Sequence, residues 1–225
     1  MAIIAKFIKR VLIVLILLFV AFHLMIAGLL AVWKTQPIDN SMFMLLHRLS
    51  GGSVTQTWVE YDHIAKSAKQ AAIASEDAKF VTHDGFDMQG IEVAMKKNES
   101  TGTVSAGGST ITQQLAKNLF LTPHRSYVRK GEEAIITVMI ENIWDKQRIL
   151  TAYLNVAEFG DGIYGIEAAA QHYFGKPASK LSQSESALLI SMLPNPKYYE
   201  QHQDAKRLRN KQRIIQKRMP SAALP

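Results

Sequence analysis

An uncharged apolar run near the N-terminus most constrains this chain. Residues 11–33 form 23 consecutive positions without a formally charged side chain. At about 1.5 Å per residue, a helix of this length crosses a hydrocarbon core of roughly 30 Å. Lys6, Lys9 and Arg10 precede the run, and basic flanks favour the cytoplasmic side of a membrane. The sequence therefore predicts one transmembrane helix at 11–33, preceded by a cytoplasmic N-terminus at 1–10.

A cleaved signal peptide is the alternative for the same run. Signal peptides have an apolar core of about 7–15 residues and a small-x-small cleavage site. The run here is longer, and Leu29, Ala31 and Trp33 offer no good site near its end. An uncleaved anchor is therefore favoured, which places residues 34–225 outside the cytoplasm.

The lack of cysteine limits the chemistry of such an exported domain. The sequence contains 225 residues and no cysteine, which excludes thiol catalysis and cysteine metal ligands. An exported chain of this size builds a hydrophobic core without disulfides. We expect a connector at 34–58, one domain at 59–200 and a basic C-terminal tail at 201–225.

Basic charge is concentrated in this tail. The chain has a net charge of +7, and residues 201–218 hold seven Lys or Arg against one Asp. Basic segments are common in nucleic-acid sites, but for an anchored, exported chain we expect anionic membrane lipid as the partner and no nucleic acid. A solvated terminal helix is the alternative.

Apolar spacing predicts a mainly helical domain. From Tyr61 onward, apolar residues recur with a helical period. Further helices are expected at 110–121, 127–144, 146–157, 163–173 and 182–193. Residues 98–108 are rich in Ser, Thr and Gly, which favours a flexible loop. No strand hairpin is predicted. The connector's apolar run SMFMLLHRL is expected to pack on the domain, and a place in the bilayer interface is the alternative.

Glu76 opens the segment EDAKFVTHDGFD. Ala68, Ala72 and Glu76 are spaced four residues apart, so Glu76 continues a small apolar helix face. Partial desolvation and the neighbouring charge of Asp77 would both favour the protonated form, which tunes a carboxylate for general-base catalysis near neutral pH. A solvated helix end is the alternative for Glu76.

The segment GGSTITQQLAKN combines a glycine turn with a helix start. Thr110 and Gln113 have the spacing of a capping box. Gly107 and Gly108 permit close approach of the backbone to a ligand, and a helix N-terminus attracts anions through its free N–H groups. Gln113 and Lys117 share one helix stripe. The sequence therefore predicts an anion site rich in hydrogen-bond donors.

A third motif, HRSYVRKGEEA, supplies three cations and two acids. The cations are Arg125, Arg129 and Lys130, followed by Glu132 and Glu133. Arg129 and Glu133 are four residues apart, so an ion pair on a helix face, contributing about 0.3–0.5 kcal/mol, is the structural alternative to a role in chemistry.

These three ordered motifs together resemble the peptidoglycan glycosyltransferase family, over about residues 60–200. The string NVAEFG is similar to the monofunctional, membrane-anchored branch of that family. The resemblance implies a mainly α, lysozyme-like glycosyltransferase domain with a small membrane-proximal subdomain. It also implies a bacterial inner (cytoplasmic) membrane protein whose catalytic domain is periplasmic.

The resemblance assigns roles to residues of this chain. It implies catalytic roles for Glu76, as the base, and for Glu133, as a second acid. The residues that match the family's pyrophosphate-binding positions are Ser109, Gln113, Lys117, Arg125, Arg129 and Lys130. Scaffold roles are implied for Asp77, His83, Asp87, Asn118 and Asn155.

The implied reaction is polymerisation of lipid II. Glu76 would take the proton from the GlcNAc 4-hydroxyl of lipid II, which attacks C1 of the donor's MurNAc and displaces undecaprenyl pyrophosphate with inversion. Moenomycin is expected to compete for the donor site. A divalent cation (Mg²⁺ or Mn²⁺) is suggested by the resemblance alone, since no metal-ligand spacing appears. Cell-wall synthesis or division proteins are the expected protein partners.

Two other classes of function fit parts of the pattern. A lytic transglycosylase or lysozyme-like hydrolase also uses a lone glutamate, but its leaving group is an uncharged sugar that needs an acid rather than a cluster of cations. A non-catalytic membrane scaffold would need neither Glu76 nor Glu133. A transpeptidase domain is not expected, because the chain is short and contains no Ser-x-x-Lys or Lys-Thr-Gly string.

Overall fold

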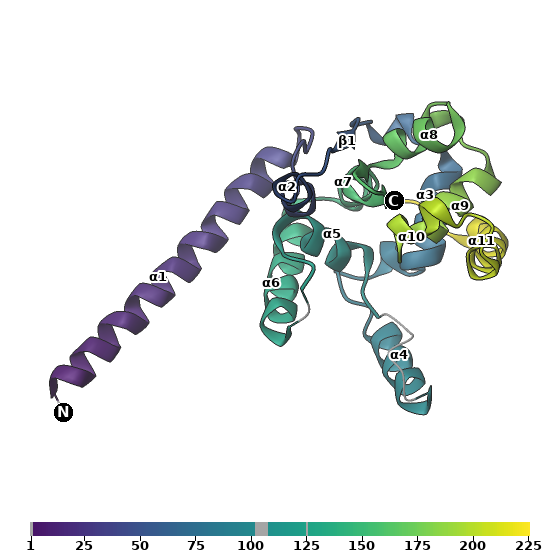
Figure 1. Cartoon of the computed structure of the whole chain (residues 1–225). Coiled ribbons are helices and arrows are strands. Elements are labelled where there is room, and N and C mark those ends of the chain that lie inside the picture. Colours follow the sequence, from purple (N-terminus) through teal and green to yellow (C-terminus); the bar gives the residue numbers. More distant parts are fainter. Residues whose placement is uncertain (1, 102–107, 125) are drawn as a thin grey trace. The chain divides into compact units, whose positions relative to one another are not determined.

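The computed structural model describes residues 2–101, 108–124 and 126–225. The chain divides into two compact units, Met1–Gln36 and Pro37–Pro225. The first unit is helix α1 (Ala2–Trp33), drawn in purple in Figure 1. Its stretch Ile4–Trp33 is long and apolar enough to cross a membrane, as the sequence predicted.

The second unit is mainly helical, which agrees with the predicted class. Its described helices are α2 (Met42–Leu49), α3 (Lys66–Glu76), α4 (Met88–Thr101), α5 (Ile111–Phe120), α6 (Tyr127–Ile143), α7 (Lys146–Val156), α8 (Ile166–Phe174), α9 (Gln183–Met192), α10 (Pro196–Gln201) and α11 (Lys206–Arg218). Helices α3, α9 and α11 pack together, and α5 packs against α6 and α7 (Figure 1).

Local capping explains why the predicted helices begin where they do. Ser126 and Asp145 accept hydrogen bonds from the backbone at the starts of α6 and α7, and Ser182 does so for α9. Thr110 and Gln113 form the predicted capping box at the start of α5. Each cap satisfies backbone N–H groups that have no partner within the helix.

Helix α7 is the central helix of this unit. Every residue from Ile149 to Val156 is buried, so the helix contacts protein on all sides. Tyr153 is among the largest fully buried side chains, together with Phe80 and Phe159. The core therefore lies around α7, between the pair α5 and α6 and the pair α3 and α9.

A small sheet corrects the prediction that the chain has no strand hairpin. Strands β2 (Glu158–Gly160) and β3 (Ile163–Tyr164) pair antiparallel, and β1 (Thr55–Gln56) pairs parallel with β3. Gly162 turns the hairpin with φ +74°. Strands of two or three residues are too short to show the alternation from which strands are predicted. The helix expected at 163–173 therefore begins later, at Ile166.

The predicted loop at 98–108 is partly helical. Helix α4 continues to Thr101, so its end replaces the start of the expected loop; residues 102–107 lie outside the described part of the chain. Helix propensity of the preceding segment extends into the Ser- and Thr-rich stretch, which composition alone assigned to a loop.

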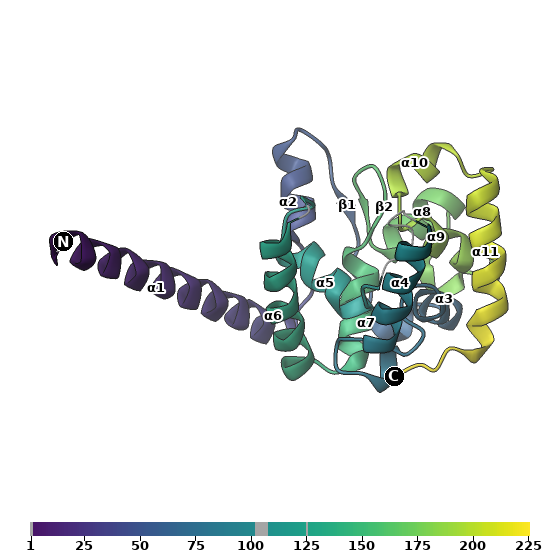
Figure 2. The ribbon, with the colours of Figure 1, turned by 90° about the horizontal axis from the view of Figure 1, so that it is seen from below.

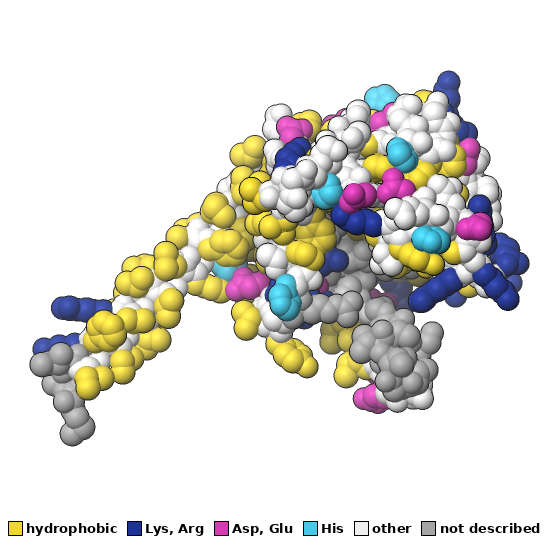
Figure 3. All heavy atoms as spheres, viewed as in Figure 1, with side chains coloured by type: hydrophobic (Ala, Val, Ile, Leu, Met, Phe, Trp, Pro, Cys, Tyr) yellow, Lys and Arg dark blue, Asp and Glu magenta, His cyan; other side chains and the backbone are white. Residues whose placement is uncertain are grey.

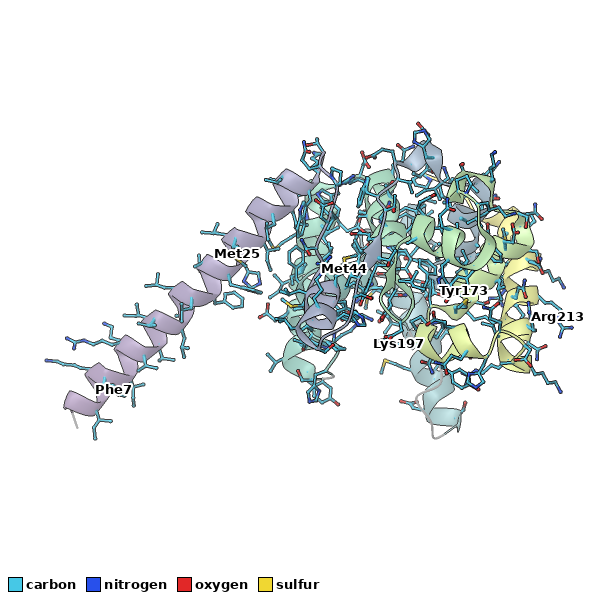
Figure 4. All side chains as sticks on the ribbon, turned by 45° about the horizontal axis from the view of Figure 1, so that its top comes forward. Phe7, Met25, Met44, Tyr173, Lys197 and Arg213 are labelled. Atoms are coloured by element: carbon cyan, nitrogen blue, oxygen red, sulfur yellow. The ribbon has the colours of Figure 1, made fainter. Side chains whose placement is uncertain are left out.

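The apolar run of the connector forms helix α2. Met44 is fully buried and Figure 4 shows it within the second unit, while Leu49 is 75% exposed. Helix α2 packs against α5, which confirms that the run packs on the domain. Strand β1 also ties the connector to the domain, so the predicted boundary at residue 58 does not separate two structures.

The C-terminal residues are part of the compact unit and do not form a tail. Leu208, Gln212, Ile215 and Met219 are buried, at intervals of four, three and four residues. They place α11 against α3 and α9, and Figure 2 shows α11 along one edge of the unit. The abundance of Lys and Arg in the sequence obscures this regular buried face.

Candidate active site

Glu76 is the last residue of α3 and lies at the centre of a polar cleft. Its side chain is 13% exposed. One carboxylate oxygen, Oε1, accepts hydrogen bonds from Ser75 Oγ at 2.6 Å and from Lys211 Nζ at 3.1 Å. The other oxygen, Oε2, accepts from Gln114 Nε2 at 3.2 Å. These three donors fix the direction of both carboxylate oxygens.

Gln114 connects Glu76 to the core of the domain. Its Oε1 accepts a hydrogen bond from the Tyr153 hydroxyl at 3.1 Å. Burial raises the pKa of Tyr153 well above its ordinary value, and the charges of Glu76 and Asp77 raise it further, so the hydroxyl keeps its proton. Because the amide oxygen is occupied by this donor, the amide nitrogen is directed at Glu76. Gln114 therefore orients the carboxylate.

Gln113, the neighbouring glutamine, was predicted to bind the pyrophosphate. It is 3% exposed, and its Oε1 accepts a hydrogen bond from the Thr110 N–H at 3.0 Å. Gln113 borders a separate small hollow with Ser109 and Lys130. Its Oε1 thus completes the capping box, and its side chain lies at the same hollow as two other residues predicted to bind the pyrophosphate. The role of Gln114 was not predicted.

Asp77 and His83 hold the turn that follows Glu76. Asp77 Oδ2 accepts the N–H of Ile111 at 3.1 Å, and its Oδ1 lies 2.8 Å from His83 Nε2. The N–H of Gly85 donates to His83 Nδ1 at 3.1 Å, which assigns the imidazole proton to Nε2. Burial raises the pKa of Asp77, and the hydrogen bond from His83 partly offsets this effect. The pair thus joins the turn to the start of α5.

A second layer of contacts supports the same turn. Lys146 Nζ donates to the carbonyl of His83 at 2.7 Å and to Glu141 at 2.8 Å. Thr112 Oγ1 also donates to Glu141, at 2.6 Å. A side chain at Gly85, where φ is +88°, would meet Thr137 at 2.6 Å. These contacts leave little freedom for the turn.

The other residues predicted as scaffold are Asp87, Asn118 and Asn155. Asp87 pairs with Lys79 at 3.8 Å and borders the hollow beside Glu76. Asn118 is buried in α5. Asn155 exchanges two hydrogen bonds of 2.9 Å with the backbone of Val59, so it fastens the residues before α3 to the central helix.

Glu133 forms ion pairs with two cations of the third motif. It is 3% exposed. Arg129 donates to it at 2.8 Å, and Lys130 forms a short contact with its other oxygen. Lys130 also donates to Ser109 at 3.2 Å. The structure therefore brings Ser109, Arg129, Lys130 and Glu133 together as one group.

The other two predicted cations are Lys117 and Arg125. Lys117 lies on α5, with its Nζ 5.6 Å from the centroid of the Phe43 ring, and borders the same hollow as Glu76. Arg125 lies outside the described residues.

Two hollows meet at Glu76. One, of about 450 Å³, is bordered by Asp77, Asp87 and Arg218. The other, of about 680 Å³, is bordered by Gln114, Lys117, Asn195, Arg207 and Lys211. Ser75, Glu76 and Ser109 border both. A carboxylate between two hollows can take a proton from a group in one of them while a bond is broken in the other.

Lys211 was missed by sequence reasoning because α11 was assigned to a tail. Its position could have been found from Leu208, Ile215 and Met219, which are seven and four residues apart and so predict a helix packed on one side. Such a helix must also present residues at the border of its packed face, and Lys211 is one of them.

In the described part of the chain, three carboxylates near the site already contact basic groups. Glu76 contacts Lys211, Asp87 contacts Lys79, and Glu133 contacts Arg129 and Lys130. A divalent cation would have to displace one of these basic groups. His47, Glu158 and Asp161 form a separate group, in which Lys197 already contacts both acids.

Comparisons with known proteins show to which family this chain belongs. A family model described as Transglycosylase matches residues 44–220. A biosynthetic peptidoglycan transglycosylase of Dechloromonas aromatica is 47% identical, with 100% of both chains covered. Proteins of the same name from Acinetobacter baylyi and Laribacter hongkongensis are each 46% identical, with 98% of this chain and 99% of the relative covered.

The matched region includes both hollows and all of α11. The transglycosylase domain is a lysozyme-like helical domain, so the predicted fold class is confirmed. The match covers far more than half of the chain, and the relatives match it from end to end. This chain belongs to the transglycosylase family.

Proposed function

We propose that this chain is a peptidoglycan glycosyltransferase that polymerises lipid II and uses Glu76 as its general base. The observation that carries the assignment of the base is the position of Glu76 between the two hollows, with three hydrogen-bond donors on its carboxylate. Family membership supports the reaction, and the relatives are named biosynthetic peptidoglycan transglycosylases.

The acceptor's sugar occupies the hollow bordered by Asp77 and Arg218. There the GlcNAc 4-hydroxyl gives its proton to Glu76 as its oxygen attacks C1 of the donor's MurNAc. The bond from C1 to the pyrophosphate oxygen breaks, undecaprenyl pyrophosphate leaves, and the anomeric centre inverts. The proton remains on Glu76 until solvent removes it, so the step is balanced without another reactant.

The donor's pyrophosphate lies at Lys117 of the other hollow and at the cations of the third motif. Negative charge accumulates on this leaving group in the transition state, and positioned cations and N–H or O–H donors stabilise it. Lys117 of α5 borders this hollow, and Lys130 Nζ donates a hydrogen bond to Ser109 Oγ at 3.2 Å. Glu133 orients Arg129 and Lys130 rather than taking part in proton transfer, because both of its oxygens are occupied by them.

Membrane anchoring places the enzyme beside its substrate. The N-terminal helix anchors the chain in the bacterial cytoplasmic membrane, with basic residues at 6, 9 and 10 on the cytoplasmic side. The catalytic unit then lies on the outer side, where both glycan partners are tethered to the same leaflet. The donor site should also bind moenomycin, which resembles the lipid-phosphate donor.

An assay on detergent-solubilised protein tests the reaction. Fluorescent lipid II is incubated with the protein, and the products are separated on a gel. We expect a ladder of glycan chains that disappears when moenomycin is added. Shortening of preformed glycan without a ladder would assign the protein to the lytic class, and the lack of both activities would favour a scaffold.

A further inference from the structure

Helix α11 presents three cations to the cleft, and the proposed reaction uses one of them. Arg207, Lys211 and Arg218 are separated by four and seven residues, which places them on one face of the helix. Lys211 contacts Glu76 at 3.1 Å. Arg207 borders the larger hollow and Arg218 the smaller one.

These two arginines lie on either side of Glu76 along the helix. At 1.5 Å per residue, Arg207 is about 6 Å and Arg218 about 10 Å from the level of Lys211, in opposite directions. Both are exposed, and neither forms an ion pair with a carboxylate of the described residues. Asp87, which borders the hollow of Arg218, is instead paired with Lys79. Each hollow therefore contains one guanidinium available for an anionic ligand.

The chemistry of a guanidinium selects the ligand. Arginine binds carboxylates and phosphates through paired hydrogen bonds in a fixed planar geometry. In the proposed reaction the donor's pyrophosphate is served by Lys117, Arg129 and Lys130. The other anion that both sugar substrates carry is the acidic peptide attached to MurNAc.

We infer that Arg207 and Arg218 bind carboxylates of the peptides carried by the two sugar substrates, one on each side of Glu76. Arg207 shares its hollow with Lys117, so it binds the peptide of the donor; Arg218 binds that of the acceptor. This inference rests on the proposed function. It explains why the cations of α11 continue beyond Lys211 along the cleft.

Arg213 provides a matched control on the same helix. It lies two residues from Lys211, about 200° around the helix, and it is exposed. Figure 4 shows Arg213 directed away from the rest of the unit, and Figure 3 shows the dark-blue basic side chains that cover this edge. If the net charge of α11 alone raised the affinity for substrate, Arg213→Gln would weaken binding too. If the cations must lie in the cleft, Arg213→Gln would bind substrate as wild type does.

The test compares two substrates in full-length protein. One is lipid II with free peptide carboxylates, and the other is lipid II whose peptide carboxylates are converted to carboxamides. For Arg207→Gln and Arg218→Gln we expect KM to rise about ten-fold with the acidic substrate. We expect kcat to be unchanged, no effect of either variant with the amide substrate, and wild-type kinetics with both substrates for Arg213→Gln.

A donor-only analogue separates the two hollows. Blocking the sugar 4-hydroxyl prevents lipid II from acting as acceptor, so its peptide enters only the donor's hollow. Coupling of this analogue to unmodified lipid II should depend on its peptide carboxylates in wild type and in Arg218→Gln, but not in Arg207→Gln.

Equal losses with acidic and amide substrates would overturn the inference, because the arginines would then bind another anion such as the pyrophosphate. Unchanged kinetics in both variants would overturn it too. Melting temperatures equal to that of wild type establish that the variants are folded. If wild type makes no glycan ladder, the proposed function itself fails; a normal ladder without dependence on the peptide refutes this inference alone.

Discussion

Lys211 Nζ lies 3.1 Å from Glu76 Oε1, although the two residues are 135 positions apart in the sequence. The contact joins the C-terminal helix α11 to the last residue of α3. The most basic helix of the chain is thereby part of the environment of the proposed base. The charge of Lys211 balances that of Glu76 at a position with limited access to water.

Replacing Lys211 by glutamine should slow the reaction. The ammonium group donates to Glu76 Oε1 at 3.1 Å and holds the carboxylate between the two hollows. Without this charged donor, kcat should fall about ten-fold. Lys211→Arg keeps the charge and should lose less. Equal kcat values for wild type and Lys211→Gln would show that the contact has no role in the reaction.

The adjacent glutamines of α5 should respond in opposite ways. Gln114→Ala removes the side chain that connects Glu76 to Tyr153, so kcat should fall at least ten-fold with little loss of stability. Gln113→Ala removes half of a capping box, so the free energy of unfolding should fall by about 1 kcal/mol. Steady-state kinetics and thermal unfolding on both variants separate the two effects. A larger loss of kcat in Gln113→Ala than in Gln114→Ala would contradict this assignment.

Glu133→Gln should weaken use of the pyrophosphate donor. The buried carboxylate holds Arg129 and Lys130 through both of its oxygens, and an amide offers one acceptor and no charge. Loss of these positioned cations should lower kcat/KM by about 10²–10³-fold. Moenomycin affinity, measured by competition, should fall in parallel. Tight moenomycin binding by Glu133→Gln would show that Glu133 does not orient the cations.

Asp77 should make the stability of the domain depend on pH. Burial raises the pKa of this carboxyl in the folded protein, so the folded state binds the proton more tightly than the unfolded state. Its contribution to stability is therefore greatest below its ordinary pKa of about 3.9 and declines as the pH rises through the raised value. Over that window, the melting temperature of wild type should fall relative to that of Asp77→Asn. Parallel curves for the two proteins would refute this assignment.

Local sequence signals predicted most of the helical framework. The capping box of Thr110 and Gln113 was predicted from spacing, and apolar periodicity predicted the helices that Ser126, Asp145 and Ser182 cap in the structure. The spacing of Arg129 and Glu133 likewise predicted the ion pair that the structure contains. Such contacts depend on helical geometry alone, so they are readable before the fold is known.

Contacts between distant segments were not predictable in this way. Lys211 reaches Glu76 only because α11 packs on α3 and α9, and the sheet forms only because Thr55 is brought beside Ile163. The orienting role of Gln114 depends on the hydrogen bond that it accepts from Tyr153, a residue of another helix. The roles of these residues depend on tertiary packing, which the local sequence motifs do not reveal.

The conversion of fluorescent lipid II by Glu76→Gln tests the central claim most directly. The amide keeps the shape of the side chain and cannot accept the proton, so we expect no glycan ladder while lipid II still binds. Glu92→Gln is the control and should give a normal ladder. Glu92 is exposed on α4, and within the described residues its carboxylate pairs only with Lys96. A wild-type rate of polymerisation in Glu76→Gln would show that Glu76 is not the base.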